Sequence, residues 1–297
     1  MRNRISGMTL IEALIALAIF GIILSLAYGA ITSSLNVQNQ QEALTTTQSK
    51  LRRIIEVISQ DLRSAVFGSI TDDPYVSGPQ QVSFMLLSGG AGFPVLDGSD
   101  FPTRLQFDAL IPAGATVSAG QQVVLVNTAG LGVVVPVTHV SGISGSGART
   151  VTTSCRLTIP YDDGVLMFQI ETTGMQYDAD SGHMFLETAG VDEQPFAFDL
   201  SDLRFDYVYT YTSPESAAIT GTPAETVIIE TNPRRGAHGL PVRTFVDSGF
   251  LFTLTRLQVV AEAIAEVNGR QTTHAFSGQV DLSRAAHFKV EEIVPCS

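Results

Sequence analysis

The sequence predicts an α+β fold, in which a long N-terminal α-helix is followed by an antiparallel, β-rich globular domain. Two observations lead to this fold class. An apolar N-terminal segment continues into an amphipathic segment, and no proline occurs between Thr32 and Gly68. After Pro74 the apolar residues change from helical spacing to the alternation that is typical of strands.

The composition of the chain argues against several classes of protein. The chain has 297 residues, of which 44% are hydrophobic, enough for one large domain or two small ones. Its net charge is −12, so general binding to DNA or RNA is disfavoured, because such binding depends on neutralising phosphates with Lys and Arg. Two cysteines are too few for a disulfide scaffold or a structural zinc site.

The N-terminus reads as a basic leader (1–7) and a membrane-spanning segment (about 10–31). Ala13 to Ile31 carry no charge, and as a helix they span roughly 28 Å, the thickness of a bilayer core. Arg2 and Arg4 favour a cytoplasmic N-terminus, which places the rest of the chain outside. We therefore expect a single-pass protein with an extracytoplasmic C-terminal domain.

The helix is predicted to continue beyond the membrane, over residues 8–70 in all. Apolar residues recur three, four or seven positions apart, which places them on one face of a helix. This stripe is made of Leu44, Leu51, Ile55, Ile58, Leu62 and Val66. We expect it to pack against the globular domain.

Residues 71–297 are predicted to form that β-rich domain, with a subdivision near residue 195 as an alternative. The expected strands are 81–87, 104–109, 122–127, 133–140, 151–159, 165–172, 184–187, 201–212, 226–230, 250–267 and 270–282. The last two flank Asn268-Gly269, a strong signal for a hairpin turn.

The beginning of the chain resembles the class III signal of type IV pilins and type II secretion pseudopilins. The resemblance rests on the basic leader, on Gly7, on Glu12 five residues later and on the apolar stretch that follows. It implies that a prepilin peptidase cuts between Gly7 and Met8 and that Met8 is N-methylated, although the family more often has Phe there. It also implies that Glu12 pairs with the N-terminal amine of a neighbouring subunit during assembly.

Two other interpretations of this segment are an ordinary signal peptide cleaved after Ala27-Tyr28-Gly29 and a plain signal anchor. The amphipathic continuation of the helix argues against a signal peptide. A mature chain that began at Ala30 would keep the amphipathic stripe but lose the apolar half with which it forms one continuous helix.

A second, weaker resemblance connects residues 62–70 (LRSAVFGSI) and the end of the last strand, near Val280-Asp281-Leu282, with W-like minor pilins and J-like pseudopilins. It implies a minor pilin near the fibre tip that helps to initiate assembly, with roles in adhesion, twitching motility or DNA uptake. The implied partners are other major and minor pilins, the prepilin peptidase and the inner-membrane assembly platform. The location would be the inner membrane and then the periplasm and the cell-surface fibre. The alternatives are a pseudopilin of a type II secretion system and a membrane-anchored or secreted binding protein.

Residues suited to catalysis are sparse, so we expect no enzyme. The histidines show no metal-ligand spacing, and neither G-x-S-x-G nor a phosphate-binding glycine motif occurs. Asp178 and Asp180, at alternate positions before a glycine, could bind calcium, the one cofactor that the sequence suggests. A hairpin turn explains the same residues.

Two further features each leave two interpretations open. Arg234, Arg235 and Arg243 form a basic loop in an acidic protein, either a contact surface for anions or a neighbouring subunit, or a solvated loop. Cys155 and Cys296 could form a disulfide outside the cytoplasm, or remain two buried thiols.

Overall fold

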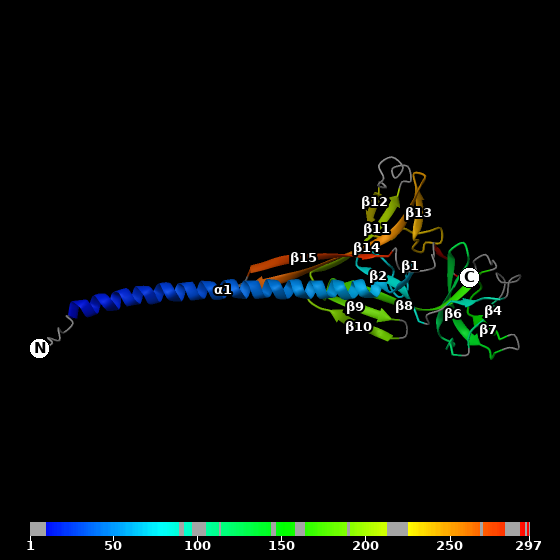
Figure 1. Cartoon of the computed structure of the whole chain (residues 1–297), viewed down its shortest axis with the longest axis horizontal. Helices are drawn as coiled ribbons and strands as arrows, with labels where there is room; N and C mark the ends of the chain where they lie inside the picture. Colours follow the sequence, from blue (N-terminus) through cyan, green and yellow to red (C-terminus); the bar gives the residue numbers. More distant parts are fainter. Residues whose placement is uncertain are drawn as a thin grey trace, which may run out of the picture. The chain divides into compact units, whose positions relative to one another are not determined.

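The computed structural model describes residues 10–88, 92–96, 105–112, 114–143, 147–157, 164–188, 191–212, 225–267, 270–282, 292–294 and 296. Within them, the helix α1 (Leu10–Arg63) is followed by strands that pair almost entirely antiparallel (Figure 1). This arrangement confirms the predicted α+β class.

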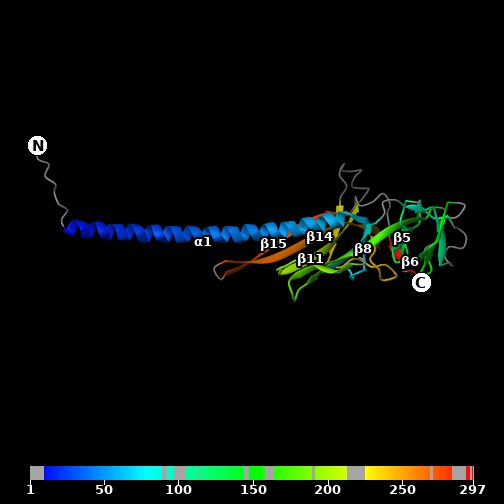
Figure 2. The same cartoon turned by 90° about the horizontal axis from the view of Figure 1, so that it is seen from below.

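The helix α1 is one uninterrupted element (Figure 2), and it ends earlier than expected. The helical pattern extended to residue 70, but the amide of Ser64 closes the last turn on the carbonyls of Gln60 and Asp61, and strand β1 begins at Ala65. Ala65 pairs with Leu86 of the next strand. The prediction of helix over 64–70 was therefore wrong, because strand pairing outweighs the local helical spacing.

In the described part of the chain, eleven strands form the first sheet. Its main path runs β1-β2-β8-β5-β6-β7-β4, and the remaining strands pair at its sides. The C-terminal strand β16 pairs in parallel with β6. The members are β1 (Ala65–Thr71), β2 (Gln81–Leu87), β3 (Phe93–Pro94), β4 (Gln106–Ala109), β5 (Gln122–Val126), β6 (Leu131–Val140), β7 (Arg149–Thr153), β8 (Leu166–Asp178), β9 (His183–Thr188), β10 (Val191–Ala197) and β16 (Glu292–Val294).

Five strands form the second sheet, in the order β12-β11-β14-β13, with β15 also paired to β14. They are β11 (Asp202–Thr212), β12 (Glu225–Glu230), β13 (Thr244–Asp247), β14 (Phe250–Val267) and β15 (Arg270–Asp281). The predicted pairing of the last two strands is confirmed, while their turn, Asn268-Gly269, lies outside the described residues.

Each of the eleven expected strands has a counterpart, and five further strands were not expected: β1, β3, β10, β13 and β16. Four of these lack a readable alternation. β3 has two residues, β13 and β16 are very short, and β10 is largely polar and contains Pro195. These strands form because they pair with a neighbouring strand, and a local sequence pattern does not show which segments will be neighbours.

The chain divides into two compact units, one of Met1–Lys50 with Ile264–His274 and one of Leu51–Ala263 with Ala275–Ser297. In the second unit, the apolar stripe of α1 packs into the core through Leu51, Ile55, Ile58 and Leu62. The same cluster contains Phe205, Tyr207 and Leu257 of the second sheet. That sheet begins at Asp202, close to the subdivision considered near residue 195. The second unit contains the first sheet and the second sheet except for the parts of β14 and β15 within Ile264–His274.

Candidate functional site

The first half of α1 is apolar on all sides and exposed. Between Leu10 and Ile31, the exposed fractions of its large apolar side chains range from 52% for Leu24 to 82% for Leu10. Among the described residues, α1 is the single helix long and apolar enough to cross a bilayer. A helix that is hydrophobic all round needs an apolar environment, either lipid or other helices.

Glu12 lies in the first described turn of this apolar segment and is exposed. It is the only acidic residue of α1 before Glu42. A carboxylate is favoured electrostatically near the N-terminus of a helix, but it is costly inside an apolar assembly unless a cation accompanies it. Gly7 and Met8 lie outside the described residues, so the proposed cleavage site has no structural description.

Residues 2–28 match the model of the prokaryotic N-terminal methylation motif. The match includes the basic leader, Glu12 and most of the apolar part of α1, and it supports the class III signal of type IV pilins and pseudopilins. No curated protein and no solved structure matches the chain significantly. Together with the exposed apolar helix, the motif supports a pilin-like protein that is anchored in a membrane by its N-terminus.

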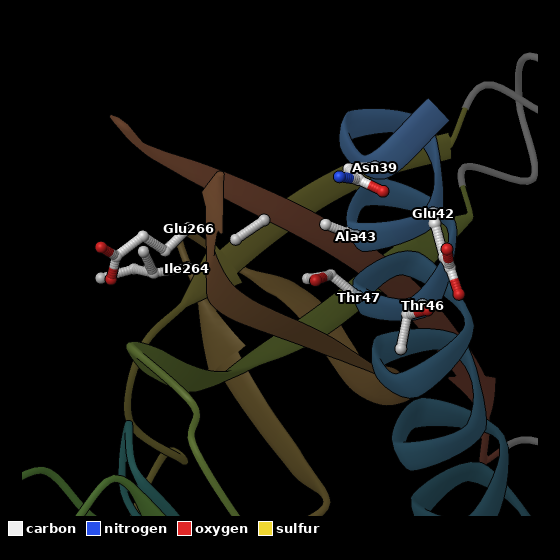
Figure 3. Close-up of a pocket in the computed structure, with 8 residues that line it drawn as sticks. Asn39, Glu42, Ala43, Thr46, Thr47, Ile264 and Glu266 are labelled. Atoms are coloured by element: carbon white, nitrogen blue, oxygen red, sulfur yellow. The ribbon is translucent and has the colours of Figure 1, made fainter. Parts of the chain in front are cut away.

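An open groove of about 390 Å³ lies beside the next part of α1, and no local sequence pattern predicts it. Helix residues Asn39, Glu42, Ala43, Thr46 and Thr47 line one side, and Ile264, Ala265 and Glu266 of β14 line the other (Figure 3). The lining of the groove contains two carboxylates but neither an imidazole nor a thiol, so it lacks the usual constellation for nucleophilic catalysis.

The two cysteines meet beside the first sheet, just after strands β7 and β16. The structure joins Cys155 to Cys296 in a disulfide, with 5.6 Å between their Cα atoms, across a sequence separation of 141 residues. Both side chains pack against a cluster of β5, β6 and β7 residues that also contains Val294 of β16. The bond therefore holds the C-terminal strand to the sheet.

Asp178 and Asp180 lie in the turn between β8 and β9. The Asp178 carboxylate accepts bonds from the Ser181 hydroxyl at 2.6 Å and from the Asp180 amide at 3.1 Å. The bond from Ser181 is the main cause that lowers the pKa of Asp178. These contacts are those of an Asx-type turn, and no cluster of three metal-ligand side chains occurs among the described residues.

The arginines of the basic loop contact their own domain. Arg235 pairs with Asp72 and donates to the carbonyls of Gly239, at 2.8 Å, and Ser77, at 3.2 Å. Arg234 pairs with Glu230 at 2.5 Å, and its guanidinium lies 4.7 Å from the ring centre of Phe245. Arg243 lies just before β13, and its carbonyl accepts a bond from the Leu254 amide at 2.7 Å. The geometry of Arg234 and Arg235 thus favours a structural role over an anion-binding one.

Proposed function

We propose that the protein is a minor type IV pilin, a low-abundance subunit that helps to initiate a fibre near its tip. The observation that carries this proposal is the prepilin-type motif, with Glu12 in place, at the start of a helix whose first half is apolar and exposed. Pilin-like proteins are structural subunits, and the sparse catalytic chemistry of the chain agrees with that role.

The proposed assembly step follows from electrostatics. Cleavage after Gly7 leaves a free amine on Met8, which is then N-methylated and stays cationic. Among packed apolar helices, that cation and the Glu12 carboxylate of a neighbouring subunit are each costly alone and compensate one another as a pair. The pair would set the axial register of an added subunit. Arg2 and Arg4 would keep the leader on the cytoplasmic side, where the peptidase and the assembly platform act.

The size of the extracytoplasmic region supports a minor rather than a major subunit. Residues 65–297 carry both sheets, a large domain for a subunit that packs many times along a fibre body. The presence of Glu12 argues that the protein engages a neighbour's amine. A pseudopilin of a type II secretion system is the second candidate, because the same N-terminal motif serves both assemblies.

The first test is the mass of the N-terminal peptide of the protein purified from its native host. We expect a peptide that begins at N-methylated Met8, and a Gly7→Ala variant should retain Met1 and the leader. A wild-type peptide that begins at Ala30, or that retains Met1, would contradict the proposal.

The second test separates the two assemblies. In cells that carry Glu12→Gln, we expect at least a tenfold loss of surface fibres, with protein secretion intact. The matched control is Glu42→Gln, which removes the next acidic residue of the same helix and should leave fibres unchanged. Loss of secretion with normal fibres would instead assign the protein to a type II pseudopilus.

A further inference from the structure

Six strands of the first sheet close on themselves to form a small β-barrel. Pairing runs from β8 through β5, β6 and β7 to β4, and β3 pairs with the opposite edge of β8; Figure 1 shows β4, β6 and β7 side by side. The barrel closes between β3 and β4, where Val95 forms a bridge with Ala109 and the Leu96 amide donates to the Asp108 carbonyl at 2.8 Å. Its core is separate from the main core and contains a buried residue of each strand: Phe93, Phe107, Val123, Val135, Val151 and Met167.

One mouth of the barrel carries polar side chains that point inward. Because neighbouring strands pair antiparallel, β5 and β7 both begin at this mouth, and the barrel part of β8 ends there. Side chains alternate between the two faces of a strand, so a residue two positions from a core residue points inward as well. The three polar residues that meet this condition at the mouth are Arg149, Gln121 and Gln169, two positions from Val151, Val123 and Met167 respectively.

The two glutamines are hydrogen-bonded to one another and to a nearby loop. The Gln169 amide donates to Oε1 of Gln121 at 3.2 Å and to the Thr116 carbonyl at 2.9 Å. Oε1 of Gln121 also accepts a bond from the Ser118 amide at 3.0 Å. Val117 of the same loop packs into the barrel core, so these bonds fix the loop at the mouth.

Arg149 differs from the glutamines, because its Nε is buried and has no hydrogen-bond partner among the described residues. It lies opposite Ala109, a core residue, and directly paired residues point to the same face. The carboxylate beside Ala109, that of Asp108, alternates to the outer face and accepts a bond from the Thr150 hydroxyl at 2.6 Å. A buried donor without a partner is costly, and a guanidinium is the side chain that best matches the oxygens of a carboxylate or a phosphate.

We propose that this mouth of the barrel binds a small anionic group, a carboxylate or a phosphate, with the Arg149 guanidinium as its charged anchor. A barrel of about eight strands has an interior that side chains just fill, so a barrel of six has no space inside for a ligand. Binding is therefore confined to the mouth, where β-barrels commonly hold ligands. Because the net charge of −12 repels anions, we expect weak binding. The inference is independent of the proposed fibre role and assigns the domain a recognition site of its own.

The first test is arginine footprinting of the full-length wild-type chain in detergent. Phenylglyoxal reacts with accessible guanidinium groups, and mass spectrometry gives the rate at each arginine, with inorganic phosphate or acetate replacing chloride at constant pH and ionic strength. A dissociation constant of about 5 mM corresponds to a reaction at Arg149 that is about fivefold slower in about 20 mM anion. Arg156 is the matched control, because it is exposed just after β7 and should react at an unchanged rate. Protection by phosphate alone identifies a phosphoryl group as the ligand, and protection by acetate identifies a carboxylate.

The second test does not depend on the reactivity of Arg149. Phosphate also stabilises proteins non-specifically because it is excluded from their surface, and an Arg149→Gln variant measures that background. In urea unfolding, the two anions should raise the midpoint more in the wild type and in Arg156→Gln than in Arg149→Gln. Circular dichroism of Arg149→Gln before urea is added establishes that the variant is folded.

Two results would overturn the inference. One is an Arg149 that reacts at the same rate with and without either anion, or that is protected no more than Arg156. The other is an equal rise of the unfolding midpoint in the wild type and in both variants.

Discussion

Gly278 of β15 lies so close to Ile55 of α1 that a Cβ atom added to the glycine would be 2.3 Å from Cγ2 of the isoleucine. Ile55 is buried, and a β-branched side chain in a helix is held in essentially one χ1 rotamer, so it cannot turn away. The absence of a side chain at position 278 is therefore what lets this strand lie against the helix.

Gly278→Ala should lower the free energy of unfolding by about 1–3 kcal/mol, the usual cost of overpacking a core. Urea unfolding of the full-length chain in detergent, followed by circular dichroism, measures this change. Gly142→Ala is the matched control: no atom lies within 4 Å of its added Cβ, and we expect a change below about 0.5 kcal/mol. In the double variant Gly278→Ala/Ile55→Ala, the loss of unfolding free energy should be smaller than the sum of the losses in the two single variants. Full additivity would show that the close approach is not the cause.

Loss of the Cys155–Cys296 bond should destabilise the second unit substantially. The bond closes a loop with a sequence separation of 141 residues, which in the chain-entropy account corresponds to about 3–5 kcal/mol. We expect the Cys155→Ala/Cys296→Ala variant to unfold at lower urea concentration, and dithiothreitol to affect the wild type but not the variant. Equal unfolding midpoints with and without reductant in the wild type would contradict this prediction.

Arg235→Lys should be destabilising even though it preserves the charge. The guanidinium reaches Asp72 and two backbone carbonyls at once, whereas an ammonium group cannot reproduce that planar arrangement. The Arg235 side chain is one-third exposed, which limits the ion-pair contribution, so we expect about 1 kcal/mol for Arg235→Lys and about 1–3 kcal/mol for Arg235→Ala. Arg53→Ala, at an exposed helix position, is the control. Similar stability of all three variants would show that the network contributes little.

Stability should fall in alkaline solution because of two buried tyrosines. Burial raises the pKa of Tyr209 from its ordinary value of 10.0 to about 12, and burial also raises that of Tyr207. As the pH rises, the unfolded chain therefore loses these two protons before the folded chain does. The contribution of the two tyrosines to the free energy of unfolding is fully present below pH 10 and is lost as the pH rises through the folded-state pKa. The free energy of unfolding should decrease by up to about 1.4 kcal/mol per pH unit for each tyrosine.

Urea unfolding at pH 9, 10 and 11 measures that slope, and Tyr209→Phe should reduce it. Tyr211→Phe serves as the control, because Tyr211 is only partly buried. A free energy of unfolding that stays constant over this pH range would contradict the prediction.

Much of the fold was predictable because its signals are local. The change from helical spacing to alternation indicated the α+β class, and the residues around Asn268-Gly269 predicted β14 with the bounds that it has, Phe250–Val267. The stripe of Leu51, Ile55, Ile58 and Leu62 identified the buried face of the helix. The end of the helix was not predictable, because Ala65 leaves the helix to pair with Leu86, a residue distant in the sequence.

The candidate site was likewise predictable only in part. Glu12 and the prepilin-type motif are read from contiguous residues, whereas the groove beside Ala43 appears only because β14 lies next to that part of α1. The contacts of the basic loop could not be predicted either, because the partner of Arg235 is Asp72, more than 160 residues earlier in the chain.

The sequence by itself determined the apolar helix, its N-terminal motif and the β-rich character of the rest, because each depends on residues within a few turns or one strand. Only the tertiary structure decided which strands pair and that Cys155 meets Cys296. These features depend on contacts between segments that are remote in the chain, and a local pattern indicates that a residue is apolar without showing what covers it.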